Sequence, residues 1–161
     1  MGDAIDHSTP HTHPEACHPV PSILVVDDSP AMREVLEEVL TSAGYEVTGV
    51  ASGGRALEAM AAHLPSLVII DLLMPGMSGF TLRSLMLRRA ELAAIPVIIV
   101  SGFWHRPGET LDAALVLPKP ISVDRLLEGV RQLVGPARPT SGQPFTPPPA
   151  SGMVDASRFS D

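Results

Sequence analysis

The stretch Ile23-Leu24-Val25-Val26-Asp27-Asp28-Ser29-Pro30 decides the fold of this chain. Its apolar run is rich in β-branched residues, which predicts a strand buried on both faces. The run stops at two carboxylates, after which Ser29 can cap a helix and Pro30 suits the first helical turn. A buried strand that passes directly into a capped helix is typical of a β/α unit in a parallel sheet.

Outward from this stretch, short apolar runs and helical periods alternate as far as Gly135. Further strands are predicted at 45–51, 67–70, 97–100 and 115–117. Helices are predicted from Pro30 to about Gly44, at 56–64, at 80–90 and from Ser122 to Val134. Pro107 and Gly108 interrupt 103–114, so at most one or two irregular helical turns are expected there. Five β/α units in succession predict an α/β fold, a five-stranded parallel sheet with helices on both faces.

Proline and small polar residues mark the two ends of the chain. Ten of the 17 prolines lie in 1–22 and 136–161, two stretches without an apolar period. We expect both stretches to be disordered, because they lack the apolar surface that would offset the entropy of ordering. Histidines and Cys17 in the first, and a Pro-x-x-Pro pattern in the second, are interpreted as parts of solvated tails. The intervening 23–135 is expected to form one domain.

Composition excludes several classes of protein. The 161 residues carry a net charge of −7, which argues against a DNA-binding surface. A single cysteine excludes an internal disulfide framework. The longest apolar runs are far shorter than the roughly 18 residues of a membrane span, and no apolar stretch near the N-terminus marks a secretory signal. We therefore expect a cytoplasmic protein without DNA or membrane partners.

Five polar side chains stand where predicted strands end. They are Asp27, Asp28, Asp71, Ser101 and Lys119. The carboxyl ends of parallel strands form the functional crevice of such sheets, so we expect these side chains to converge there. Each one alone has an ordinary explanation in turn chemistry or in helix-end charge. Their convergence at one edge is what indicates a site.

Three carboxylates at one edge need a cation, or some of them must stay protonated. At about 5 Å and an effective dielectric constant near 20, each pair repels by roughly 3 kcal/mol. An oxygen-only ligand set suits Mg²⁺, which would also neutralise an incoming phosphoryl group. Lys119 is the only lysine of the chain, and it supplies a compact charge for a phosphoryl oxygen or a carboxylate. A carboxylate can itself act as a nucleophile toward phosphorus.

Four segments of the chain resemble the receiver domain of bacterial two-component response regulators. They are the opening stretch 23–30, Asp71-Leu72-Leu73-Met74-Pro75-Gly76-Met77-Ser78-Gly79, Val97-Ile98-Ile99-Val100-Ser101-Gly102 and Leu117-Pro118-Lys119-Pro120. The resemblance covers Ile23 to about Gly135. It implies a flavodoxin-like receiver fold and a phosphoprotein that serves two-component or phosphorelay signal transduction.

The resemblance implies a role for each polar residue in phosphoryl transfer. Asp71 would accept a phosphoryl group from a phosphohistidine on a sensor histidine kinase or a histidine phosphotransfer protein. Ser101 would bond a phosphoryl oxygen and Lys119 would pair with the acyl phosphate. The bond between Lys119 and Pro120 would be cis. Such a protein is a self-phosphorylating acceptor with slow autodephosphorylation, and not a turnover enzyme.

The resemblance also implies the metal ligands. The cofactor would be Mg²⁺ or Mn²⁺. Direct ligands would be Asp28, Asp71 and the backbone carbonyl of Leu73, with Asp27 acting mostly through water.

Several features depart from the family pattern. Val116 occupies the position at which receivers usually carry a switching Tyr or Phe, and 101–119 is shortened, with Gly102 directly after the serine. A subset of receivers with a poorly formed fourth helix is similar. The apolar Leu73 and Phe103 stand at positions that tune dephosphorylation, and we predict that they shield the acyl phosphate from water. No output domain is expected in 136–161, so a single-domain protein, monomeric or weakly dimeric, would signal by contacts with an unknown output protein.

Three alternative functions remain open at this stage. A receiver-fold binding module that is never phosphorylated is consistent with Val116 and the reduced fourth helix. A phosphatase or phosphotransferase with an aspartyl nucleophile is disfavoured, because such enzymes commonly place an acid two residues after the nucleophile, where this chain has Leu73. A nucleotide site is weaker still, because 52–55 is not a phosphate-binding loop.

Overall fold

The computed structural model describes residues 19–102 and 112–137 of the chain. Most of both predicted tails lies outside these ranges. The elements follow one another as β1 (Ser22–Val26), α1 (Pro30–Ser42), β2 (Glu46–Val50), α2 (Gly53–Ala62), β3 (Leu67–Asp71), α3 (Gly79–Leu87), α4 (Ala90–Ala93), β4 (Val97–Ser101), β5 (Leu115–Pro118) and α5 (Val123–Val134). Among the described helices, none has both the length and the apolar character needed to cross a membrane.

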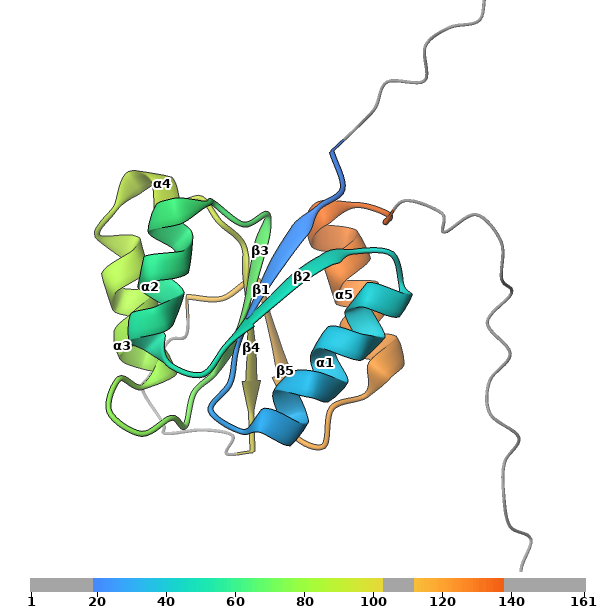
Figure 1. The fold of residues 1–161 in the computed structure, drawn as a ribbon, viewed down its shortest axis with the longest axis horizontal. Coiled ribbons are helices and arrows are strands. Elements are labelled where there is room, and N and C mark those ends of the chain that lie inside the picture. The colour runs from blue at the N-terminus through green and yellow to red at the C-terminus, as the bar shows by residue number, and fades with distance from the viewer. Residues whose placement is uncertain (1–18, 103–111, 138–161) are drawn as a thin grey trace, which may run out of the picture.

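The strands form one parallel sheet in the order β2-β1-β3-β4-β5. Helices α1 and α5 cover one face, and α2, α3 and α4 cover the other (Figure 1). Each face carries its own apolar cluster, and β3 and β4 are buried throughout. The predicted five-stranded α/β fold is therefore confirmed.

A serine directly precedes and caps each of four helices. Each accepts a hydrogen bond from the backbone N–H three residues later, which satisfies one of the free donors of the first turn. They are Ser29, Ser52, Ser78 and Ser122. The predicted caps at Ser29 and Ser122 are confirmed. The second helix begins at Gly53, three residues before the predicted start, because Ser52 caps it there.

The predicted helix over 80–90 was wrong in its extent. Helix α3 ends at Leu87, and a separate short helix α4 begins at Ala90. Between them, the N–H groups of Arg88 and Arg89 each bond the carbonyl three residues earlier, so the last turn of α3 tightens and closes. No glycine or proline marks this break, which is why the helical period hid it.

The connection between β4 and β5 falls largely on 103–111, outside the described residues. In its described part, residues 112–114 form no helix. The one or two helical turns predicted within 103–114 are therefore not present at Asp112, Ala113 or Ala114. Ala113 instead packs against the apolar cluster beneath α2, α3 and α4.

The chain enters β1 and leaves α5 at the amino ends of the strands, on the side opposite the carboxyl ends (Figure 1). The hydroxyl of buried Tyr45 donates a 3.0 Å hydrogen bond to the carbonyl of Gly135. Gly135 ends α5 with φ 85°, as its position after the last helical residue predicted. The bond holds the end of α5 beside the start of β2.

Gly79 begins α3 in close contact with the end of β3. A Cβ there would stand 2.5 Å from the carbonyl oxygen of Asp71, 2.8 Å from Leu72 Cα and 2.9 Å from Ile70 Cγ2. We expect Gly79→Ala to lower the free energy of unfolding by about 1–3 kcal/mol, because backbone must shift to make room. Urea denaturation measures this. Gly54→Ala, where a Cβ meets nothing within 4 Å, is the control; equal loss in both variants would contradict the expectation.

Candidate functional site

Strand ends bring the predicted polar residues to one edge of the sheet. Asp27 directly follows β1, Asp71 ends β3, Ser101 ends β4 and Lys119 directly follows β5. Asp27, Asp71 and Ser101 are buried, although each is polar. The backbone N–H of Lys119 donates to the Ser101 carbonyl at 3.0 Å, which joins the last two strand ends.

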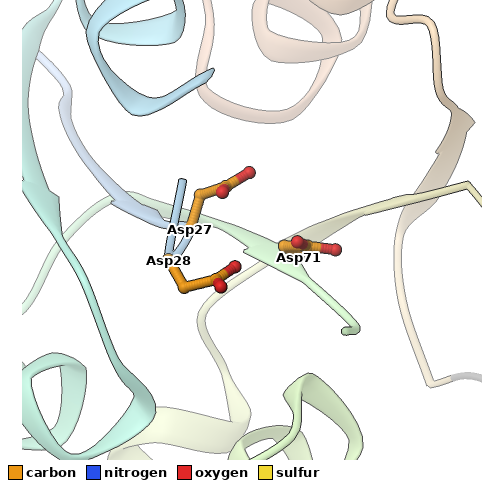
Figure 2. A group of neighbouring side chains, drawn as sticks. All are labelled: Asp27, Asp28 and Asp71. Atoms are coloured by element: carbon orange, nitrogen blue, oxygen red, sulfur yellow. The ribbon is translucent and has the colours of Figure 1, made fainter. Parts of the chain in front are cut away.

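Three carboxylates gather at this edge. One oxygen from each of Asp27, Asp28 and Asp71 lies within 4.8 Å of the others (Figure 2). Asp27 and Asp71 are buried and Asp28 is exposed. Like charges at this distance repel. The set contains only oxygen donors and reaches solvent through Asp28, which fits a small, hard divalent cation that keeps part of its water shell.

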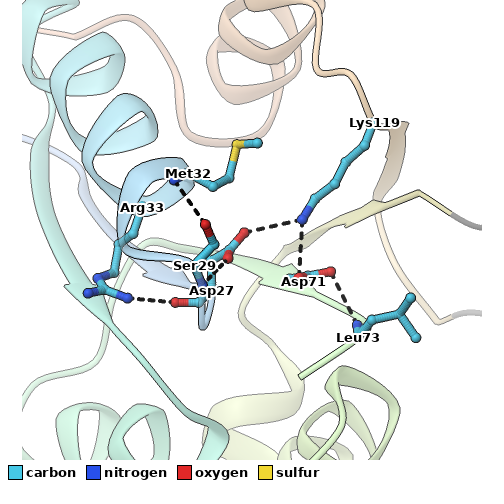
Figure 3. Close-up of polar contacts among 7 residues, drawn as sticks. All are labelled: Asp27, Ser29, Met32, Arg33, Asp71, Leu73 and Lys119. Carbon is cyan, nitrogen blue, oxygen red and sulfur yellow. Dashed lines mark hydrogen bonds and ion pairs between the residues drawn. The ribbon is translucent and has the colours of Figure 1, made fainter. Parts of the chain in front are cut away.

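Lys119 supplies the positive charge of the site. Its Nζ donates to Asp71 Oδ2 at 3.1 Å and to Asp27 Oδ2 at 3.4 Å (Figure 3). Burial acts to lower the pKa of Lys119, but the hydrogen bond to Asp71 and the charges of both carboxylates outweigh it, so the pKa lies above its usual value. The ammonium therefore stays protonated at neutral pH. The predicted cis bond between Lys119 and Pro120 is present.

Asp27 is held at each of its polar atoms. Its N–H donates to the Val50 carbonyl at 3.2 Å, and its Oδ1 accepts from the Ser29 N–H at 2.8 Å. Its Oδ2 accepts from Lys119, and its carbonyl oxygen accepts from Arg33 Nη1 at 2.8 Å. A buried carboxylate needs such partners, because an unpaired one costs several kcal/mol. Asp27 is thus a fixed point of the site.

Asp71 is held by two donors of different kinds. Its Oδ1 accepts from the Leu73 N–H at 3.2 Å, and its Oδ2 accepts from Lys119. The Leu73 side chain is 55% exposed and stands beside the site on the loop after β3. The Asp71 carboxylate is therefore oriented by a backbone donor on one oxygen and by an ammonium on the other.

The predicted switch and tuning residues lie in different surroundings. Val116 pairs with Ile99 in the sheet and packs, partly buried, against the cluster beneath α2, α3 and α4. Gly102 directly follows β4 and is exposed. Phe103 lies outside the described residues. A partly buried aliphatic side chain thus occupies the position at which the resemblance leads one to expect an aromatic ring.

Two arginines hydrogen-bond residues of other segments, and their roles were not predicted from the sequence. Arg33 of α1 binds the Asp27 carbonyl, and Arg83 of α3 is buried, with Nε on the Asp112 carbonyl at 2.7 Å and Nη2 on its carboxylate at 3.0 Å. Gly49 in the middle of β2 was a usable signal for Arg33, because a glycine within a strand often marks a close approach. Nothing in the apolar period of α3 distinguishes Arg83 as buried.

We expect Asp28→Asn to stabilise the protein in Mg²⁺-free buffer. The substitution removes an exposed charge that lies within 4.8 Å of two other carboxylates. The gain should be about 1 kcal/mol, because solvent screens this position. Thermal unfolding measures it, with the substitution Asp124→Asn at an exposed aspartate of α5 as the control. A lower melting temperature for Asp28→Asn than for wild type would show that repulsion does not dominate this edge.

Comparison with known proteins identifies the family. A sequence profile described as "Response regulator receiver domain" matches residues 23–131. The chain therefore belongs to the response regulator receiver domain family, whose members serve two-component signalling.

The similar proteins differ in how much of their length the match covers. The polar-differentiation response regulator DivK of Brucella ovis is 29% identical over 120 residues, which cover 72% of this chain and 98% of DivK. Sensor histidine kinase TmoS of Ectopseudomonas mendocina is 36% identical over 121 residues, but these cover 71% of this chain and only 12% of TmoS. The structure of Vibrio cholerae chemotaxis protein CheY4 superimposes with a TM-score of 0.66 at 27% identity, over 71% of this chain and 99% of CheY4.

Proposed function

We propose that this receiver domain accepts a phosphoryl group on Asp71 in a reaction that needs Mg²⁺ or Mn²⁺. The donor is a phosphohistidine on a sensor histidine kinase or a histidine phosphotransfer protein. The observation that carries the proposal is the geometry of Asp71. Its carboxylate is buried at a strand end, oriented on both oxygens, and grouped with two further carboxylates and the only lysine of the chain.

The chemical step is one displacement at phosphorus. A carboxylate oxygen of Asp71 forms the new P–O bond while the P–N bond to the donor imidazole breaks, and the electron pair of that bond returns to the imidazole nitrogen. Lys119 lies 3.1 Å from an Asp71 oxygen and is placed to pair with the negative charge that arrives. Ser101, at the end of β4, supplies a hydroxyl at the same edge.

The metal ligands follow from the same edge. Asp28, Asp71 and the Leu73 backbone carbonyl would hold the cation directly, and Asp27 would act mostly through water. When bound, the cation neutralises the carboxylates and the phosphoryl oxygens. Asp27 remains in place without it, because its four polar atoms are already bonded within the protein.

The consequence of phosphorylation is a change in protein contacts. The modification adds nearly two negative charges beside Ser101 and Lys119, which can bias the segment that follows β4. Val116 of β5, just after this segment, packs partly buried against the apolar cluster beneath α2, α3 and α4. We therefore propose an acceptor that signals through a partner protein, with no turnover of a substrate.

Intact mass spectrometry tests the proposal. The chain is incubated with acetyl phosphate and Mg²⁺, with a parallel sample in EDTA. The expected result is one phosphoryl adduct with Mg²⁺ and none in EDTA. A chain that forms no adduct from acetyl phosphate or from a phosphorylated phosphotransfer protein, and that shows no Mg²⁺ binding by calorimetry, would instead be a receiver-fold binding module that works without phosphorylation.

Leu73→Asn should shorten the lifetime of the phosphorylated form. The exposed leucine lies two residues after Asp71, and an amide there can hydrogen-bond an attacking water that leucine excludes. We expect phosphate release to accelerate several-fold, and up to about 100-fold. A time course of phosphate release measures this, with Leu64→Asn, also half exposed, as the control. An unchanged release rate in Leu73→Asn would remove Leu73 from the shielding role.

A further inference from the structure

We propose that Arg33 is a positioning residue for the cation site, acting through the peptide that joins Asp27 and Asp28. The inference rests on the proposed function, since it concerns how tightly the acidic edge holds Mg²⁺. Arg33 makes no contact with a carboxylate of the site. Its Nη1 instead donates a 2.8 Å hydrogen bond to the Asp27 carbonyl oxygen (Figure 3).

The position of that carbonyl decides where two carboxylates point. The Asp27 carbonyl belongs to the peptide plane between Asp27 and Asp28, so its orientation sets the backbone from which both side chains leave. The Asp27 carboxylate has further anchors in Ser29 and Lys119. Asp28, by contrast, is exposed. The bond from Arg33 therefore fixes the plane from which the exposed ligand extends.

Gly49 provides the path by which Arg33 reaches this carbonyl. Arg33 lies on α1, and its stem crosses β2 at Gly49, which pairs with Val25 of β1. A Cβ at Gly49 would stand 2.8 Å from both Cγ and Cδ of Arg33, and it would overlap the Glu37 carboxylate. The missing side chain of Gly49 thus leaves a space on the sheet surface, which the Arg33 stem and the Glu37 carboxylate share. Two independent features, the hydrogen bond and this space, point to the same placement of the guanidinium.

Three variants test the inference through Mg²⁺ affinity in titration calorimetry. Arg33→Met keeps the stem and removes the donor, and we expect Mg²⁺ to bind about 10- to 100-fold more weakly, the range typical of groups that orient metal ligands. Arg33→Lys keeps a charged donor and should recover most of the affinity. Gly49→Ala leaves Arg33 in the sequence but displaces its stem together with the Glu37 carboxylate, so it should lose affinity as Arg33→Met does. Glu37→Gln, which leaves Arg33 in place, is its control and should bind Mg²⁺ like wild type.

The double variant distinguishes positioning from general loss of stability. If both substitutions break the same contact, the double variant that carries Arg33→Met and Gly49→Ala should bind Mg²⁺ no more weakly than whichever single variant has the lower Mg²⁺ affinity. Losses that multiply would contradict the inference. Arg55→Met, which removes an exposed arginine of α2, and Gly54→Ala, where a Cβ meets no atom, are matched controls that should bind like wild type. Urea denaturation of each variant shows that it is folded.

The outcomes separate this inference from the proposed function. If wild type binds Mg²⁺ and a folded Arg33→Met variant binds it equally well, Arg33 has no positioning role. The phosphoacceptor proposal would then still stand. Wild type that binds no Mg²⁺ would overturn both, and the failure would be visible before any variant is made. Weaker binding in Arg33→Met, rescued by Arg33→Lys, is the result that supports the inference.

Discussion

Asp71→Asn is expected to abolish the phosphoryl adduct that wild type forms with acetyl phosphate and Mg²⁺. The amide has the shape of the carboxylate, and its one oxygen can still accept from Lys119 or from the Leu73 N–H, so the local fold should persist. Its oxygen carries no negative charge, however, and it is a poor nucleophile toward phosphorus. Intact mass spectrometry should therefore detect incorporation in wild type and none in the variant.

A matched control makes this result specific. Asp124→Asn alters an exposed aspartate of α5 and should be phosphorylated like wild type. An adduct that persists in Asp71→Asn would place the acceptor elsewhere, with Asp28 the first candidate because its carboxylate is exposed in the same group. Peptide mapping of the adduct would then decide between the two positions.

Lys119→Met is expected to have the largest effect on stability. The ammonium is the shared partner of Asp27 and Asp71, whose side chains are only 2% and 7% exposed. Its removal leaves two buried carboxylates without their cation, which should cost about 3 kcal/mol of unfolding free energy in Mg²⁺-free buffer. This value lies at the lower end for a broken buried ion pair, because a quarter of the lysine side chain is exposed.

Mg²⁺ should restore part of that loss, because a cation bound to the native state stabilises it by mass action. Urea denaturation with and without Mg²⁺ measures both effects. Lys119→Arg keeps the positive charge and is the control for stability. The planar, forked guanidinium cannot replace the compact ammonium at the acyl phosphate, so we expect this variant to be phosphorylated more slowly than wild type. If Lys119→Met is as stable as wild type in Mg²⁺-free buffer, the ion pairs of Lys119 do not offset the cost of burying the Asp27 and Asp71 carboxylates.

Much of the fold could be predicted because its signals are local. The apolar runs at β1, β3 and β4 are short, continuous and rich in β-branched residues, as strands covered on both faces require. Serine caps and Gly135 mark helix ends for reasons contained in the first or last turn. The end of α3 at Leu87 was missed, because a tightened last turn needs no particular residue.

The site was predictable for a different reason. In a parallel sheet, topology alone brings strand ends together, so Asp27, Asp71 and Lys119 could be placed at one edge without knowledge of any contact. Arg33 and Arg83 could not be placed this way. Their partners are a backbone carbonyl of another element and a residue 29 positions away, and neither relation leaves a period or a motif in the sequence. Roles that depend on Phe103 remain predictions.

The side on which the described chain begins and ends has a practical consequence for binding experiments. The start of β1 and the end of α5 lie together at the amino ends of the strands, with Gly135 fastened by Tyr45 (Figure 1). A biotin group or a sensor surface joined through that side would leave the acidic edge on the opposite side, open to solvent through Asp28. A bulky phosphorylated donor should therefore still be able to approach the acidic edge of surface-immobilised protein.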